Sequence, residues 1–508
     1  MQRLSHFLRR PGLKALGAAL LGSATLMLAS LPAAALETKT PIKHVVVIYQ
    51  ENISFDHYFA TYPNALNKPE EPKFVAKPGT PSVNGLSGAL LTNNPNGVNP
   101  MRLDRAAAVT CDMDHDYGPE QNAYNGGLLN RFPEYSGSRK PGCDPKTVMG
   151  YYDGNTVTAW WNYAQAFALS DNFFNTQYGP STPGVLNLVA GSTGGAIGGD
   201  IPGLVRSGWI ISDADPALDD CSGGKNKLTI KDRRHVGDQL NDKAVTWGWF
   251  QGGFKPTETR ADGSIVCGAT TANAAGKLVR DYSPHHNPFQ YYAHSANPKH
   301  LPPSSPAMIG KPDQAKNQYD LADFWTAVDG GNMPAVAFLK APAAQDGHAG
   351  YSGPLDEQKF LVETINRLMQ RPEWASMAIL VAYDDSDGWY DHVMPPLVRA
   401  STFPEDALSG PGKCGEAGTP TSIATGPCGY GPRLPFLVVS PYARENFVDS
   451  NLQDQTSILR FIQDNWSLGR LGGTAMDAYA GSIETMFDFK AKPRLTPVLL
   501  DPQSGLPR

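Results

Sequence analysis

The chain has 508 residues, of which 41% are hydrophobic and 18% are charged, so it can bury one large core or two moderate ones. Its 43 Lys and Arg residues against 49 Asp and Glu residues give a formal net charge of −6, which excludes the basic footprint of a nucleic-acid-binding protein. The 51 glycines and 43 prolines predict long loops over a rigid scaffold, where binding and catalytic groups usually lie.

Residues 1–35 have the layout of a secretory signal peptide. Basic residues up to Lys14 precede an apolar run over residues 15–31, and small residues ending at Ala35 follow it; a cleavable signal has this order. We expect cleavage near Ala35 and a periplasmic or secreted protein, exported by the Sec or the Tat route. An uncleaved membrane anchor is the alternative, although the apolar run is short for a spanning helix.

The first strand of the mature chain is expected at residues 44–49, a run of β-branched and aromatic residues typical of a buried central strand. Glu51 and Asn52 follow it directly. Ligands of open α/β sheets bind at the carboxyl ends of strands, and a carboxylate beside a carboxamide offers oxygen ligands to a divalent cation. Glu51 and Asn52 are therefore metal-ligand candidates, with a loop start or a helix cap as the ordinary alternative.

Six cysteines form an even set in a chain with an export signal, which favours disulfides over metal thiolates. Pairing the cysteines that are nearest in sequence gives three bridges, although six cysteines allow about 15 pairings. The bridges would join Cys111 to Cys143, Cys221 to Cys267 and Cys414 to Cys428.

Ser181 is a candidate nucleophile because of the helix that is expected after it. Pro183 suits the first helical position, with Thr182 as the cap. Ser181 would then lie at a helix N-terminus, where free N–H groups and the helix dipole favour an anion such as a phosphoryl group. A turn or capping serine is the alternative.

Three histidines are candidates for the same site. His115 lies in an acidic loop at residues 111–117 that is otherwise typical of a solvated surface. His286 follows His285 between prolines and aromatic residues, where a stacked surface pair is the alternative to a position facing the site. His348 follows an expected strand at residues 334–340 and should lie at the same sheet edge as Glu51.

The second half of the expected metal site is Asp384 and Asp385, which follow an apolar strand at residues 377–383. Two carboxylates at a strand end are costly unless a cation neutralises them. Helices are expected at residues 356–370 and 454–466, and a further strand at residues 434–441.

Together these segments resemble the bacterial phosphoesterase family, which holds non-specific phospholipases C and acid phosphatases of the AcpA type. The motifs that carry the resemblance are Glu-Asn-x-Ser-Phe-Asp-His-Tyr-Phe at 51–59, Gly-Pro-Ser-Thr-Pro at 179–183, His-His-Asn-Pro-Phe at 285–289 and Tyr-Asp-Asp with Gly-Trp-Tyr-Asp-His at 383–392. The resemblance implies an α/β, alkaline-phosphatase-like sandwich with a central, mostly parallel sheet and helices on both faces. A single catalytic domain at 36–508 would carry loop insertions near 61–110, 196–280 and 400–430.

The resemblance also implies site roles. Glu51, Asn52, Asp384 and Asp385 would bind a divalent metal ion of unknown identity and number, and Ser181 would attack phosphorus. His115, His286 and His348 would act on the transition state or the leaving group, with His286 or His348 as an imidazolium that favours acidic pH.

The sequence around the nucleophile favours one branch of this family. Phospholipases C typically have Pro-Thr-x-Pro-Asn-Arg there, whereas this chain has Ser181-Thr-Pro-Gly, similar to the acid phosphatases. We therefore expect an acid phosphatase that acts on phosphate monoesters through a phosphoserine, with phospholipase C as the first alternative, on a phospholipid surface. A non-catalytic phosphate or lipid binder is the second alternative.

Overall fold

The computed structural model describes residues 37–508 except 232, 402, 404–405, 407–413 and 415–425. The expected signal peptide and most of the expected insertion at 400–430 lie outside the described residues. Residues Thr38–Arg508 form one compact unit. None of the described helices combines the length and the apolar character that a membrane span needs.

A nine-stranded sheet forms the core, with the strand order β15-β10-β16-β1-β17-β18-β4-β19 and with β20 also paired to β4. The antiparallel strand β18 lies between β17 and β4, and the other pairings are parallel. The expected α/β class with a mostly parallel sheet is confirmed. The strands are β1 (His44–Gln50), β4 (Ala168–Phe174), β10 (Trp247–Gln251), β15 (Gln318–Asp320), β16 (Val336–Lys340), β17 (Met377–Tyr383), β18 (Arg433–Val439), β19 (Phe447–Asp449) and β20 (Gln453–Asp454).

Strands β1 and β17 lie at the centre of this sheet and are fully paired, from His44 opposite Met377 to Gln50 opposite Tyr383. Every residue of β17 is buried, and so is β1 beyond His44. Continuous apolar runs of this kind are typical of parallel strands that helices cover on both faces. Because the two strands run in the same direction and end level, the residues that follow them emerge at one point of one sheet edge.

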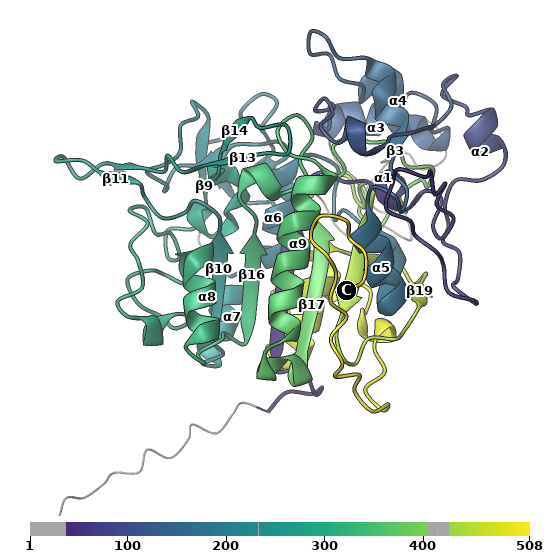
Figure 1. The fold of residues 1–508 in the computed structure, drawn as a ribbon. Coiled ribbons are helices and arrows are strands. Elements are labelled where there is room, and N and C mark those ends of the chain that lie inside the picture. The colour runs from purple at the N-terminus through teal and green to yellow at the C-terminus, as the bar shows by residue number, and fades with distance from the viewer. Residues whose placement is uncertain (1–36, 232, 402, 404–405, 407–413, 415–425) are drawn as a thin grey trace, which may run out of the picture. The chain divides into compact units, whose positions relative to one another are not determined.

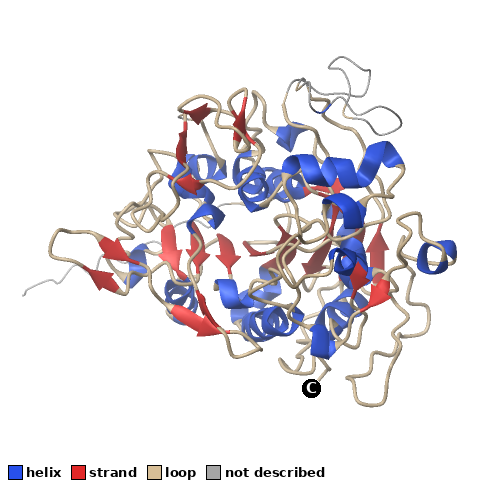
Figure 2. Ribbon diagram, turned by 90° about the horizontal axis from the view of Figure 1, so that it is seen from above, coloured by secondary structure: helices blue, strands red, loops and turns tan. Residues whose placement is uncertain are grey.

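Helices cover both faces of the sheet, as the row of strands between them shows in Figure 2. On one face α6 (Ser181–Ala190) contacts α7 (Val236–Asp242) and α10 (Gln455–Asn465). On the other face (Figure 1), α9 (Pro354–Met369) contacts α5 (Thr158–Ala166), and its Arg367 stacks on Trp325 of α8 (Leu321–Asp329). The expected helices at 356–370 and 454–466 are therefore present, each with bounds within two residues of those predicted at its start.

Short helices and strands lie within the expected insertions. Residues 61–110 hold α2 (Ala89–Thr92) and β2 (Met101–Arg102), and β2 pairs with β3 (Gly150–Tyr151). The span 196–280 carries small strands, but it also contributes α7 and the sheet strand β10, so it is not an insertion throughout. The remaining described helices and strands are α1 (Phe55–Phe59), α3 (Tyr117–Tyr124), α4 (Phe132–Tyr135), β5 (Ala196–Ile197), β6 (Val205–Arg206), β7 (Trp209–Ile210), β8 (Asp215–Pro216), β9 (Lys227–Ile230), β11 (Glu258–Thr259), β12 (Ile265–Val266), β13 (Thr270–Ala272) and β14 (Leu278–Arg280).

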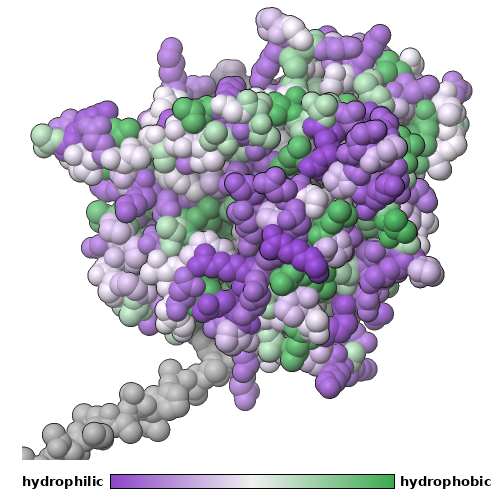
Figure 3. Space-filling view, in the orientation of Figure 1, coloured by the Kyte–Doolittle hydropathy of each residue, from purple (hydrophilic) through white to green (hydrophobic). Residues whose placement is uncertain are grey.

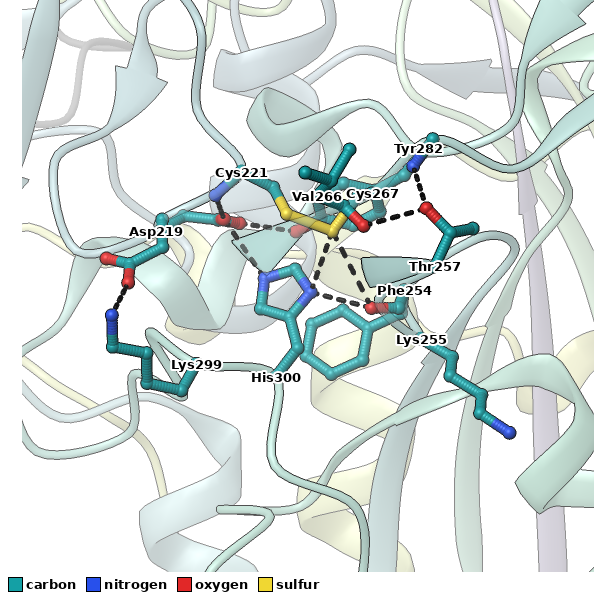
Figure 4. Close-up of a disulfide and its surroundings, with 12 residues drawn as sticks. Asp219, Cys221, Phe254, Lys255, Thr257, Val266, Cys267, Tyr282, Lys299 and His300 are labelled. Atoms are coloured by element: carbon teal, nitrogen blue, oxygen red, sulfur yellow. Dashed lines mark hydrogen bonds and ion pairs between the residues drawn. A yellow bond between two sulfur atoms is a disulfide. The ribbon is translucent and has the colours of Figure 1, made fainter. Parts of the chain in front are cut away.

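Three disulfides tie the loops, and they join the pairs that sequence proximity predicted: Cys111 to Cys143, Cys221 to Cys267 and Cys414 to Cys428. Figure 4 shows the second bridge packed beside His300, whose ring stacks on Phe254 at a centroid distance of 3.9 Å. The Nε2 atom of His300 lies 3.0 Å from Asp219. This buried cluster gives the loop region at 219–300 a small core of its own.

The surface gives no sign of a broad apolar face on the side that Figure 3 shows, where hydrophilic and hydrophobic residues are interspersed. The exposed large hydrophobic residues among those described, such as Val75, Leu128 and Leu278, come from separate loops and short strands. Scattered apolar residues of this kind are normal on a protein surface.

Candidate active site

The two expected ligand pairs meet at the edge of the sheet because they follow adjacent parallel strands. Glu51 and Asn52 follow β1, and Asp384 and Asp385 follow β17. The backbone N–H of Asn52 donates to Asp384 Oδ1 at 3.2 Å. All four side chains are buried, with relative exposures of 0%. Asn52 adopts a positive φ of 61°, a left-handed conformation that asparagine tolerates better than most residues.

Ser181 points into this carboxylate cluster. Its Oγ donates to Glu51 Oε2 at 3.0 Å and lies 3.1 Å from Asp385 Oδ2. The serine is the first residue of α6, which is ten residues long and follows Pro180 in an extended conformation. The hydroxyl therefore lies at the positive end of the helix dipole, which attracts negative charge.

The helix begins two residues earlier than the sequence predicted, because Pro183 is accommodated in the first turn, where no N–H is needed. The expected cap at Thr182 is wrong. The N-cap is Pro180, and the Thr182 hydroxyl lies 3.4 Å from the hydroxyl of Tyr291. The N–H of Thr182 donates instead to Asp213 Oδ1 at 2.9 Å.

Gly184 lets α6 approach the end of β17. A Cβ atom at this position would lie 2.1 Å from the backbone oxygen of Asp384, a distance that no real side chain shows. The carbonyl of Gly184 also accepts a hydrogen bond from Tyr49 of β1 at 3.1 Å. The glycine thus fixes the distance between the helix that carries Ser181 and the strand that carries the aspartates.

The three candidate histidines surround the cluster unequally. His286 Nδ1 lies 3.0 Å from Glu51 Oε1. His115 Nε2 lies 3.4 Å from Asn52 Nδ2, and its Nδ1 lies 3.4 Å from Asp387. His348 contacts the cluster through His115, whose ring it touches. Its Nδ1 lies 2.7 Å from the carbonyl oxygen of Ala349.

Burial works against the imidazolium that is expected at His286 or His348. Burial lowers the pKa of His286 well below its usual value, and nearby cationic groups add to this. Burial likewise lowers the pKa of His348 to about 4. Burial would also lower the pKa of His115, but the carboxylates of Asp385 and Asp387 outweigh it and raise that pKa. The charged ring is therefore favoured at His115.

Two site residues were missed in the sequence. Lys340 ends β16 with its side chain fully buried, and its Nζ forms an ion pair with Glu51 Oε1 and lies 3.3 Å from Asp384 Oδ2. Asp387 is buried in the acidic run after β17 and accepts a hydrogen bond from Asn52 Nδ2 at 3.2 Å. A lysine at the end of an otherwise apolar strand is the signal that could have identified Lys340, since lysine is almost never fully buried without partners.

The site fits a cation. Burial raises the pKa of Asp385 well above its usual value, with the charge of Asp384 adding to the effect, and burial and Glu51 raise that of Asp384 to about 8. Such a cluster of acids is costly without positive charge. The Oδ1 of Asn52 is buried without a hydrogen-bond partner among the described residues, which leaves a hard oxygen ligand available.

A cavity of about 570 Å³ is lined by Pro180, the residue before Ser181, and by His115. Its walls carry both signs of charge, and the charged groups among them are Asp112, Asp114, Asp116, Asp213, Arg139 and Lys140. Ser181 itself is buried, and through its neighbour Pro180 this cavity is the nearest described opening that shares a segment with the nucleophile candidate.

The sequence matches the model of the Phosphoesterase family over residues 42–469, which is most of the chain. The chain belongs to the Phosphoesterase family. Its membership identifies it as a phosphoric ester hydrolase, as the motifs predicted.

Curated proteins with similar sequences are named phospholipases C. The chain is 26% identical to the non-hemolytic phospholipase C of Burkholderia pseudomallei, over 92% of this chain and 62% of that protein. It is also 26% identical to phospholipase C A of Mycobacterium tuberculosis, over 92% of this chain and 81% of that protein. It thus spans less than two thirds of the Burkholderia relative. A solved protein of the alkaline phosphatase superfamily from Vibrio parahaemolyticus is 10% identical over 77% of each chain, with a TM-score of 0.29, a likeness too low to carry any functional argument.

Proposed function

We propose that this phosphoesterase is an exported phospholipase C that cleaves the phosphodiester of a phospholipid on the glycerol side. The relatives named above are phospholipases C and match across nearly the whole chain, which favours this reading over the phosphomonoesterase that the nucleophile motif suggested. The cavity at Pro180 and His115 supports it further, because its walls of mixed charge suit a zwitterionic head group. The signal-like residues 1–35 support a periplasmic or secreted location.

The observation that carries the chemistry is the Ser181 hydroxyl, which lies within hydrogen-bond distance of two buried carboxylates. In the proposed reaction the Ser181 oxygen attacks phosphorus and its proton passes to Glu51 or Asp385. The glycerol oxygen leaves as an alcohol, and water then releases the phosphorylated head group from the phosphoserine. At the start of α6 the N–H of Thr182 already donates to Asp213 and Pro183 has none, so the positive end of the helix dipole stabilises the negative charge that develops on the phosphoryl oxygens.

The proposed metal ligands are Glu51, Asn52, Asp384 and Asp385. A divalent ion at these oxygens would supply Lewis-acid polarisation of the phosphoryl group and would lower the pKa of the serine hydroxyl. Lys340 holds the other oxygen of Glu51 and so orients this carboxylate. His115 faces the cavity with a raised pKa, and we assign it to the leaving group in place of His286 or His348.

The test compares two substrates on one preparation of purified protein. We expect phosphatidylcholine vesicles to yield diacylglycerol at a higher kcat/KM than an aryl phosphate yields phosphate. A chelator should abolish both activities, and added divalent metal should restore them. Asp385→Asn should lose activity and bound metal together, whereas Asp501→Asn on the surface should retain both.

A phosphomonoesterase is the second candidate, because Ser181-Thr-Pro-Gly departs from the phospholipase pattern. Turnover of the aryl phosphate without release of diacylglycerol would favour this candidate and contradict the lipase.

A further inference from the structure

A second group of metal-binding side chains lies outside the candidate active site. His235, Asp238 and His294 each offer a ligand atom, and these atoms all lie within 4.8 Å of one another. His235 is the N-cap of α7, Asp238 is the third residue of this helix, and His294 follows the 3₁₀ helix η5 (Pro288–Tyr291). Two segments about 60 residues apart in the chain therefore meet at this point.

The hydrogen bonds of His235 determine which of its ring nitrogens carries a proton. Its Nε2 lies 3.0 Å from Ser295 Oγ, and this hydroxyl already donates its own hydrogen to the carbonyl of Phe289 at 2.9 Å. The hydroxyl must therefore accept from Nε2–H. The proton of the neutral ring is then on Nε2, which leaves a bare lone pair on Nδ1.

The lone pair on His235 Nδ1 is buried and faces a carboxylate. The His235 side chain is 1% exposed, and its Nδ1 faces the backbone N–H of Asp238 in a capping box without completing a hydrogen bond among the described residues. Asp238 Oδ2 lies 3.5 Å away. A lone pair opposite a carboxylate oxygen is repulsive unless a cation lies between the two, and a buried unpaired acceptor is costly.

His294 completes the group from the other segment. Its Nε2 lies 3.1 Å from Asp238 Oδ1 and 3.2 Å from Asp238 Oδ2. The rings of His294 and His235 stack at a centroid distance of 4.9 Å with an interplanar angle of 19°. The His294 side chain is 35% exposed and that of Asp238 is 22% exposed, so an ion can enter from solvent and keep a water ligand.

The neighbouring basic residues do not occupy the site. Arg234 forms an ion pair with Asp242. Arg233 donates to the Gly194 carbonyl at 2.9 Å and to Thr474 at 2.5 Å. Both guanidinium groups are thus committed elsewhere, and Asp238 lies within ion-pair distance of both histidines.

We propose that His235 Nδ1, Asp238 and His294 Nε2 bind a divalent transition-metal ion of the zinc class. Two imidazoles and one carboxylate are a donor set that Zn²⁺ and its neighbours prefer over Mg²⁺ or Ca²⁺. The bond from His235 Nε2–H to Ser295 supplies the outer hydrogen bond that fixes the ring of a metal-bound histidine. The ion would join α7 to the segment after η5, and its binding would stabilise the folded state.

The experiment strips the full-length mature protein with chelator, reloads it with ZnCl₂ and measures bound zinc by elemental analysis. In wild type, the backbone N–H of His235 donates to Asp238 Oδ2 at 2.9 Å. Asp238→Asn keeps an oxygen that can accept this hydrogen bond but removes the anionic ligand. His294→Ala removes the most exposed ligand. We expect each variant to lose about one zinc equivalent relative to wild type, with circular dichroism unchanged.

Asp242→Asn is the matched control, because it removes the same charge from the same helix and its carboxylate pairs with Arg234 outside the group of three ligands. It should bind as much zinc as wild type. Zinc should raise the melting temperature of wild type and of this control more than that of Asp238→Asn or His294→Ala. Bound Cu²⁺ should give an electron paramagnetic resonance spectrum with two nitrogen ligands that is absent from His294→Ala.

Equal zinc content and equal thermal shifts in wild type, Asp238→Asn and His294→Ala would overturn the proposal. An equal loss in Asp242→Asn would also overturn it, because the effect would then be one of surface charge. Neither outcome depends on turnover, so the result stands apart from the proposed lipase activity.

Discussion

Glu120 is hydrogen-bonded to the segment that precedes Ser181: its Oε2 accepts a hydrogen bond from the backbone N–H of Gly179 at 2.9 Å. Its other oxygen accepts from Ser386 at 2.6 Å, in the loop that carries Asp385. One buried carboxylate of α3 thereby fixes the distance between the segment that ends in Ser181 and the segment that carries the aspartates. Glu120 touches neither the serine nor the open cavity, so its role is one of positioning.

Glu120→Gln should therefore lower kcat by about 10- to 100-fold, because a small displacement of a nucleophile is costly, while bound metal and KM change little. Glutamine has only one acceptor oxygen and cannot satisfy both donors. Glu357→Gln is the matched control, since Glu357 is also a buried carboxylate that accepts from two hydroxyls, those of Tyr58 and Tyr383. If both variants show the same kcat, the positioning role of Glu120 is wrong.

Ser181→Ala should fold normally and lose several orders of magnitude in kcat, on the scale of a deleted covalent nucleophile. Thr182→Val should retain most of the activity, because the Thr182 hydroxyl contacts Tyr291 and does not cap α6. Mass spectrometry of acid-quenched enzyme checks the assignment directly. Phosphate found on Thr182 would contradict it.

Lys340→Met should destabilise the fold by about 3–5 kcal/mol, the usual cost of removing one partner from a buried ion pair. Both Glu51 and Asp384 would lose their cationic neighbour. Lys77→Met is the comparison at the surface, where the ion pair with Glu445 is about half exposed and contributes less than about 1 kcal/mol. Urea denaturation of metal-free protein measures both. Equal midpoints for the two variants would show that Lys340 is not needed to neutralise the cluster.

Glu357 should make stability depend on pH between about pH 5 and pH 8. Burial raises its pKa to about 8 in the folded protein, above the ordinary value of about 4.3 in an unfolded chain. The folded state therefore binds the proton more tightly, so the stabilisation is present at low pH and is lost as pH rises towards 8. Glu357→Gln should have a flatter dependence of melting temperature between about pH 5 and pH 8. A slope equal to that of wild type would exclude this residue as the cause.

The sequence by itself determined the central strands and the acidic pairs that follow two of them, and sequence proximity predicted the cysteine pairing that the structure has. Apolar runs such as residues 377–383 have the length and composition of covered strands, and Asp384 and Asp385 stand out because acids rarely follow such runs without a partner. The order of the motifs was also sufficient to identify the family, because the motifs extend through almost the whole mature chain. These features are local, so they can be read without coordinates.

Only the tertiary structure decided how these pieces act on one another. Lys340 was not singled out in the sequence because its partners Glu51 and Asp384 follow β1 and β17 and reach it only through strand pairing. The helix α6 begins two residues before the predicted start. In its first turn the Thr182 N–H is satisfied by Asp213, a partner from another loop. The ionisation of His115, His286 and His348 depends on burial and on charges that are distant in sequence. Electrostatic energy depends on distances in space, and these distances exist only once the chain has folded.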